Sequence, residues 1–123
     1  VGYEKTMLCL NEEITVSQMT DRHEIEPWGL DGGMAGGKGA TLVMRNGDKR
    51  WLTVVQAYNK QSSSKYSNVS IRKGDRVKLV MPGGGGFGAV AERALELVAE
   101  DLREGYISRD AADRIYGLPE AAE

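Results

Sequence analysis

The sequence predicts an α+β fold, with an antiparallel β-rich region in the first two-thirds and a helical hairpin at the C-terminal end. Short alternating or apolar runs separated by turn sequences fill residues 1–81, which is typical of antiparallel strands. Apolar residues then recur at helical spacing in residues 89–117, which predicts a helix pair. At 123 residues, the chain has the size of a single domain. We therefore expect one domain, in which a glycine loop at residues 82–88 joins the β-rich and helical parts.

The first two strands are expected to form a hairpin. Residues 5–10 and residues 14–19 are short apolar or alternating runs, and Asn11-Glu12-Glu13 separates them as a turn would. Two such runs joined by a short polar segment are typical of antiparallel neighbours. Residues 61–64 are polar and are expected to form a loop.

A second hairpin and a final strand complete the expected β region. Residues 40–45 and residues 50–57 flank Asn46-Gly47-Asp48, and Asn and Gly tolerate the positive φ of a hairpin turn. Lys73-Gly74-Asp75 predicts another turn. Residues 76–80 follow it with a period of two, and Pro82 ends this strand because proline cannot donate to a sheet ladder.

Two helices are expected after the glycine loop. One apolar stripe predicts the first helix, and Gly105 is expected to stop it because glycine readily takes the left-handed conformation. Ser108 predicts the N-cap of a second, short helix, which Gly117 ends. The residues of the stripe are Val90, Ala94, Leu97, Val98 and Leu102.

Composition narrows the function classes. The net charge of -2 gives no basic field for nucleic-acid binding. The single cysteine fits a reducing compartment, no apolar run approaches the roughly 20 residues that span a bilayer, and the N-terminal residues do not resemble a signal peptide. We therefore expect a cytoplasmic protein. Only 41% of residues are apolar and 16 are glycine. This composition favours a domain whose hydrophobic core is completed by residues of a partner.

The first glycine-rich stretch, residues 32–39, resembles a phosphate-binding P-loop up to its last position. Gly32 and Gly37-Lys38 have the spacing, but Gly39 stands where Ser or Thr would hold Mg²⁺. A β-like run also follows, whereas a P-loop opens a helix. We expect a long surface loop, or a loop that closes over a partner's active site with Gly36, Gly37 and Lys38 near an anionic group.

The second stretch comprises Gly83, Gly84, Gly85 and Gly86. Consecutive glycines before a helix can offer backbone N–H groups to an anion. Tight chain reversal or packing against another subunit are the alternatives. These four glycines and the three residues named above are the candidate cofactor-binding residues of the sequence.

The sequence predicts no catalytic residue and no metal site. The only histidine is His23 and the only cysteine is Cys9, whereas a zinc site wants three or four ligands. Cys9 lies in an apolar run and is expected to be a core residue, since a nucleophilic cysteine needs an exposed thiolate beside a base. His23 lies in a charged stretch that predicts a solvated turn.

Four stretches occur in a specific order: Asp21-Arg22 with residues 27–33; Lys73-Gly74-Asp75; residues 82–88; and residues 100–108 with Ala111-Ala112 and Tyr116-Gly117. Together they resemble the C-terminal end of the hydantoinase B / 5-oxoprolinase B-type family. The family also contains acetone and acetophenone carboxylases, and the resemblance runs from about Glu13 to Leu118. One departure is that Ala89-Val90 stand where the family usually has Asp-Pro, so a helix can start earlier.

The resemblance implies ATP-dependent chemistry on a carbonyl compound, carried out by partner subunits. Large A-type, kinase-like subunits would carry ATP and a divalent metal, Mg or Mn, and the larger N-terminal part of a B-type subunit would supply the second active site. No catalytic residue carries over onto this chain, and no cofactor is expected on this chain alone.

In size the chain resembles the small subunit of acetophenone carboxylase. It is therefore expected to be a small non-catalytic subunit of a biotin-independent, ATP-dependent ketone carboxylase. The alternatives are the C-terminal module of an ATP-dependent hydantoinase or 5-oxoprolinase-type amidohydrolase, a purely structural assembly module, and a free-standing ligand-binding β domain.

Overall fold

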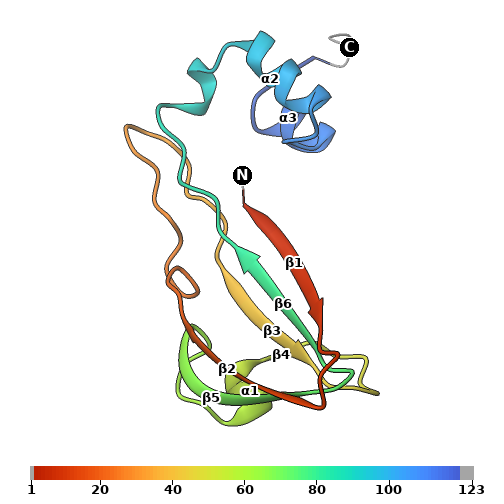
Figure 1. Ribbon diagram of the computed structural model, residues 1–123. Helices are drawn as coiled ribbons and strands as arrows, with labels where there is room; N and C mark the ends of the chain where they lie inside the picture. The colour runs from red at the N-terminus through yellow and green to blue at the C-terminus, as the bar shows by residue number, and fades with distance from the viewer. Residues whose placement is uncertain (1, 120–123) are drawn as a thin grey trace. The chain divides into compact units, whose positions relative to one another are not determined.

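The computed structural model describes residues 2–119, and its contacts divide the chain into two compact units. The β unit comprises Gly2–Pro27 and Gly37–Gly83, and the glycine–helix unit comprises Trp28–Gly36 and the described residues from Gly84 to Pro119. Antiparallel sheets occupy the N-terminal part and helices follow them (Figure 1), so the predicted α+β class is confirmed. No helix among residues 2–119 is long and apolar enough to cross a bilayer.

Two antiparallel sheets build the β unit (Figure 1). The larger sheet has four strands in the order β1 (Tyr3–Leu8), β6 (Arg76–Met81), β3 (Ala40–Met44) and β4 (Leu52–Thr53). The smaller sheet pairs β2 (Glu13–Met19) with β5 (Lys65–Arg72).

The strands β1 and β2 form one bent strand that runs through both sheets. β1 pairs with β6 and β2 pairs with β5. Between them the ladder continues, because the Cys9 N–H donates to the Asp75 carbonyl at 2.9 Å and the Gly74 N–H donates to the Cys9 carbonyl at 2.9 Å. The hairpin predicted around Asn11-Glu12-Glu13 is therefore wrong. These residues form the corner of a bent two-stranded ribbon, since β1 pairs with residues 68–78 positions away and β2 with residues 46–59 positions away.

The second predicted hairpin is correct as far as Thr53. β3 pairs antiparallel with β4, but helix α1 (Val54–Tyr58) then replaces the rest of the strand predicted at residues 50–57. A capping box starts the helix: the Gln56 N–H donates to Thr53 Oγ1 at 3.2 Å, and the Thr53 N–H donates to Gln56 Oε1 at 2.9 Å. These bonds satisfy two helix N–H groups, which favours a helix over further strand.

Strand β5 was not predicted, because a bulge interrupts its alternation. Asn68 has a φ of 54°, and the pairing with β2 shifts register between Val16 and Gln18. Only the second half of β5 shows period-two burial, with Val69 and Ile71 buried. Such a strand carries too short a pattern to be read from sequence.

The turn Lys73-Gly74-Asp75 joins β5 to β6 across the bend, and Asp75 holds it in place. The Asp75 carboxylate is buried and accepts from the Asn46 N–H at 2.8 Å and from the Arg72 N–H at 2.9 Å. Gly74 has a φ of +88°, and a Cβ there would lie 2.5 Å from the Asn46 side chain. The motif therefore ties the corner of the ribbon to the β3–β4 turn.

Between the sheets lies the core of the β unit, together with a polar network. Gln18 Nε2 donates to Thr41 Oγ1 at 2.7 Å, and the Tyr66 hydroxyl donates to Gln18 Oε1 at 2.7 Å. The buried Thr41 therefore has a partner, as buried polar groups require. The buried apolar residues of this core are Cys9, Val43, Val54, Val69 and Ile71.

The continuous helix predicted from Val90 to Leu102 is interrupted. A 3-10 turn, η1 (Val90–Glu92), comes first and helix α2 (Leu95–Arg103) follows. Arg93 between them has extended backbone, with φ -71° and ψ 128°. The early start at Val90 agrees with the sequence, but apolar spacing alone does not reveal a two-residue break.

The second predicted helix is confirmed as α3 (Arg109–Arg114). The Ala111 N–H donates to Ser108 Oγ at 3.1 Å, which is the predicted N-cap. Gly105 and Gly117 have φ of +75° and +67° just after the two helices, so glycine ends both as predicted. Val98, Ala112 and Leu118 form the small core between α2 and α3.

Candidate functional site

The glycine segment (residues 84–88) packs its backbone directly on the Trp28–Gly36 segment. The Leu30 N–H donates to the Gly86 carbonyl at 2.9 Å, and the Gly86 N–H donates to the Met34 carbonyl at 2.8 Å. The Gly88 N–H donates back to the Leu30 carbonyl at 3.0 Å. Two glycine-rich stretches whose bonded residues are 52–58 positions apart in sequence therefore form one interlocked element of the glycine–helix unit.

Three glycines in this interlock have no room for a side chain. A Cβ on Gly85 would lie 1.9 Å from the Trp28 carbonyl oxygen, and one on Gly33 would lie 2.1 Å from the Gly86 carbonyl oxygen. A Cβ on Gly29 would lie 2.0 Å from the Gly33 carbonyl oxygen. Gly84, by contrast, has open space. Glycine is therefore required at these three positions by close backbone approach.

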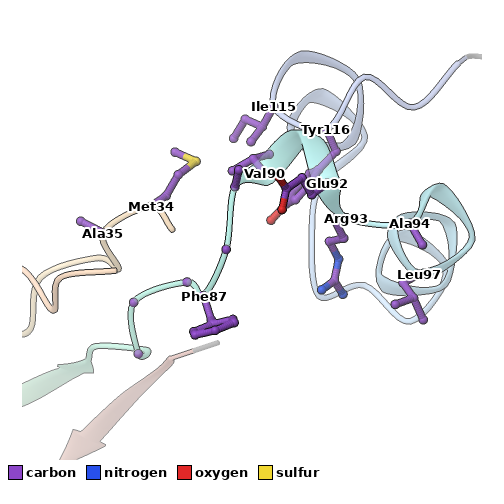
Figure 2. Close-up of a pocket in the computed structure, with 15 residues that line it drawn as sticks. Met34, Ala35, Phe87, Val90, Glu92, Arg93, Ala94, Leu97, Ile115 and Tyr116 are labelled. Atoms are coloured by element: carbon purple, nitrogen blue, oxygen red, sulfur yellow. The ribbon is translucent and has the colours of Figure 1, made fainter. Parts of the chain in front are cut away.

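Apolar side chains project from the interlock instead of filling a core. Phe87 is 80% exposed and Trp28 is 63% exposed, which is unusual for such large apolar groups. Leu30 and Met34 are also exposed. A groove of about 820 Å³ runs from the glycine segment past η1 to the helices, and Figure 2 shows its lining side chains, Leu97 among them.

The groove carries few groups that could perform chemistry. Glu92 and Arg93 are the charged residues that line it, and the Arg93 guanidinium is paired with the Asp101 carboxylate. Within residues 2–119, no group of three or more His, Cys, Asp or Glu side chains is placed to hold a metal ion. An exposed aromatic side chain beside a groove suits the binding of another apolar surface.

The first set of predicted anion-binding residues has no phosphate-loop geometry. Strand β3 begins at Ala40, directly after Gly39, so no helix follows the motif. Gly37 has open space around its Cα, and Lys38 is exposed. Gly36 belongs to the glycine–helix unit. A role for Gly36, Gly37 and Lys38 near an anion stays a prediction.

The second set is largely engaged in the interlock. The Gly86 N–H donates a hydrogen bond to the Met34 carbonyl, and Gly85 packs on the Trp28 carbonyl. Gly83 belongs to the β unit. The backbone of Gly85 and Gly86 therefore packs on another segment of the same chain, which neither alternative had named, while anion binding at Gly83, Gly84, Gly85 and Gly86 stays a prediction.

Cys9 and His23 have separate surroundings. Cys9 is buried, and its Sγ contacts the carbonyl oxygens of Asn11 at 3.4 Å and Ile71 at 3.8 Å, so its predicted core position is confirmed. His23 Nε2 lies 3.1 Å from Thr20 Oγ1. Partial burial lowers the pKa of His23, and the neighbouring charge of Asp21 opposes that shift.

The interlock is the feature that sequence reasoning missed. The signal was present, because two glycine runs in one chain indicate that two backbone segments approach closely. Nothing in the sequence showed that the two runs meet each other rather than a ligand or another subunit.

Comparisons with known proteins agree with the resemblance seen in the sequence. A family model described as hydantoinase B/oxoprolinase matches residues 1–90. The chain is 34% identical over 101 residues to an uncharacterized protein of Methanocaldococcus jannaschii, covering 82% of this chain and 16% of that protein. It is 35% identical over 98 residues to the B-type subunit of a putative D-/L-hydantoinase of Pseudomonas sp. (strain NS671), covering 80% of this chain and 15% of that one.

A solved structure also aligns with most of the chain. The ATP-dependent caprolactamase from Pseudomonas jessenii aligns with a TM-score of 0.49 at 19% identity, over 89% of this chain and 24% of that chain. The chain spans about a sixth of the length of the curated relatives it matches. Because the family model covers well over half of its residues, the chain belongs to the hydantoinase B/oxoprolinase family.

Proposed function

We propose that this chain is a non-catalytic module of a multi-subunit, ATP-dependent enzyme that acts on a carbonyl carbon. One observation carries the proposal: most of the chain matches hydantoinase B-type proteins, yet it matches only 15–16% of their length. The remaining five-sixths of a B-type protein is where the catalytic groups would lie, together with a large A-type, kinase-like subunit. ATP and its Mg or Mn ion would be bound by these partners.

The described part of the chain is consistent with a binding role. Its reactive candidates are separated, with Cys9 in the core of the β unit and His23 beside Thr20. Its unusual features are instead surfaces: Phe87, which is exposed and lines the groove of the glycine–helix unit, and the exposed Trp28 of the same unit. Apolar groups exposed in this way are typical of an interface.

Biotin-independent carboxylation of a ketone is one candidate reaction, because the sequence resembles a family that contains acetone and acetophenone carboxylases. Hydrolytic opening of a cyclic amide is the second candidate. The name of the Pseudomonas relative, which describes one subunit of a putative D-/L-hydantoinase, favours this reaction. Both reactions are consistent with activation of a carbonyl oxygen by ATP, so the choice belongs to the catalytic partners.

Mass analysis of the native complex, purified through this chain, is the experiment that tests the module role. We expect large A-type and B-type subunits at a fixed ratio. Recovery of a folded, monomeric chain without partners would overturn the proposal and would favour the free-standing ligand-binding domain.

The same complex separates the two reactions. ATP hydrolysis would be measured with acetophenone plus bicarbonate and, separately, with hydantoin. ATP use that requires bicarbonate would support the carboxylase, and ATP use with hydantoin alone would support the amidohydrolase. The isolated chain is expected to be inactive with either substrate, and catalytic turnover by the chain alone would contradict the non-catalytic role.

A purely structural module and one that completes an active site predict different mutant behaviour. Deleting residues 36–38, which lie in the stretch expected to close over a partner's site, should lower ATP-dependent turnover per assembled complex if the stretch lines that site. Unchanged turnover per assembled complex would favour the structural alternative.

A further inference from the structure

Burial falls steadily across the inner face of the four-stranded sheet. Residues directly opposite each other in antiparallel strands share a face, and Val43 of β3, Val77 of β6 and Met7 of β1 lie in one such row. Val43 is 1% exposed, Val77 is half-buried and Met7 is 38% exposed. In the next row, Thr41 of β3 is buried whereas Lys5 of β1 is exposed, and in the row after that Tyr3 of β1 is 61% exposed. The β1 side of this face therefore lacks cover.

The same gradient appears in the two-stranded sheet. Ile71 of β5 is 2% exposed, and its partner Ile14 of β2 is 40% exposed. Val69 is buried while its partner Val16 is half-buried. Both sheets are therefore packed on the β5 and β3 side and open along the bent strand that β1 and β2 form.

An apolar groove lies along this open side. Its volume is about 500 Å³ and its lining comes from β1, β2, β5 and β6, all within the β unit. A cavity of about 150 Å³ admits one benzene ring, so the groove has room for roughly three apolar side chains. Four strands on one face meet only two on the other, which explains why the space is unfilled.

The backbone along the groove also lacks partners on one side. Among the described strands, β1 pairs with β6 and β2 pairs with β5, so both lie at the edge of their sheets. An edge strand beside exposed apolar residues is a ready site for pairing with an extended segment.

We propose that an extended, apolar segment of the larger part of a hydantoinase B-type polypeptide docks in this groove alongside β1 and β2. The inference rests on the proposed function, because it takes its occupant from the five-sixths of the relatives that this chain does not match. Alternating apolar residues of the segment fill the groove and complete the core between the sheets.

A second copy of this chain is the competing occupant, because edge strands can also pair with themselves. The larger B-type polypeptide is favoured because chains of its family carry several hundred further residues beside this segment. A length of 101 matched residues that is 16% of the relative leaves about 84% of that protein to supply the segment.

The probe is the B-type polypeptide of the Pseudomonas relative, from which the 98 residues matching this chain have been removed. This polypeptide would be produced together with the full 123-residue chain, and the complex would be measured by native mass spectrometry and titration. Ile14→Glu places a charge in the groove. Thr15→Glu is the matched control, since Thr15 is the next residue of β2, faces the other side and is also exposed.

The proposal expects a 1:1 complex that Ile14→Glu weakens about 100-fold or more, because an unpaired charge in an apolar groove is costly. Thr15→Glu should change the dissociation constant less than about threefold. Amide hydrogen exchange should show new protection in β1 and β2 on binding. The unfolding temperatures of both variants, measured on the chain alone, keep loss of folding separate from loss of docking.

Other outcomes overturn the proposal in distinguishable ways. A complex that both variants form equally well would leave the module role intact and place the docking surface elsewhere. A homodimer that Ile14→Glu dissociates would assign the groove to a second copy of the chain. A monomeric chain that does not bind the probe would contradict both the groove proposal and the proposed function.

Discussion

The interlock of the two glycine segments predicts a sharp difference between two adjacent glycines. Gly85→Ala would place a Cβ 1.9 Å from the Trp28 carbonyl oxygen, whereas ordinary contact begins at 3.4 Å. The segments must therefore separate by about 1.5 Å at this point. Gly84→Ala meets nothing within 4 Å and is the matched control.

The magnitude follows from the hydrogen bonds that would break. Three backbone bonds of 2.8–3.0 Å join the segments through Leu30, Gly86 and Gly88, and lengthening by about 1.5 Å removes them. At about 1 kcal/mol each, the interlock loses about 3 kcal/mol. Alanine restores about 0.4–1 kcal/mol by restricting the unfolded chain, so a net loss of about 2 kcal/mol is expected.

Amide hydrogen exchange on the full chain measures this loss directly. The N–H groups of Leu30, Gly86 and Gly88 should exchange about 30-fold faster in Gly85→Ala, which corresponds to about 2 kcal/mol of local stability. The β6 amides, in the other unit, should be unaffected. Gly84→Ala should leave exchange unchanged or slow it slightly. Equal behaviour of the two variants would refute the reasoning that close backbone approach selects glycine at Gly85.

Three further predictions concern the β unit. Asp75→Ala leaves two backbone N–H groups without their acceptor and should cost about 1–3 kcal/mol of unfolding free energy, measured by urea denaturation; a loss under about 0.5 kcal/mol would contradict it. Thr53→Ala removes the side-chain half of the capping box and should cost about 1 kcal/mol in the same assay, with Ser as the variant that retains the cap. Burial lowers the pKa of His23 below 6.5, so the unfolded chain binds a proton at this residue more readily than the folded chain does. The free energy of unfolding should therefore have its full value above pH 6.5 and fall as the pH drops below it. His23→Gln should flatten this part of the dependence of the unfolding free energy on pH.

Local chemistry made several parts of the fold predictable. The cap at Ser108 and the stops at Gly105 and Gly117 depend on a few adjacent residues, and the structure shows each where it was expected. The turn at Lys73-Gly74-Asp75 is local for the same reason. Strand positions were also readable wherever period-two alternation was unbroken, as in β3 and β6.

Which strands pair with each other could not be predicted from the same residues. The alternation in β1 and β2 identifies two strands but contains nothing that distinguishes a hairpin from two arms of a bent ribbon. Their true partners, β6 and β5, lie about 46 to 78 positions away. Closure of such long loops is decided by the whole set of contacts that follow it, not by the turn sequence.

For the candidate sites, too, the sequence revealed the unusual residues but not what they contact. The glycine runs were recognisable as unusual, but whether their N–H groups face an anion or another backbone segment depends on what lies opposite. In the structure the Gly86 N–H donates a hydrogen bond to the Met34 carbonyl. The extended backbone at Arg93 and the positive φ of Asn68 likewise have no signal in the residue spacing.

By itself, the sequence determined the α+β class, the Ser108 cap, the helix stops at Gly105 and Gly117, the core position of Cys9 and the membership in the hydantoinase B/oxoprolinase family, because each depends on residue types at short spacing or on ordered motifs. Only the tertiary structure decided that the two glycine stretches interlock, that β1 and β2 form one bent edge strand, and that an apolar groove of about 500 Å³ stays open beside it. The physical reason is that burial and backbone contact are properties of pairs of segments. A single segment carries its own conformational preference but not the identity of the segment that covers it.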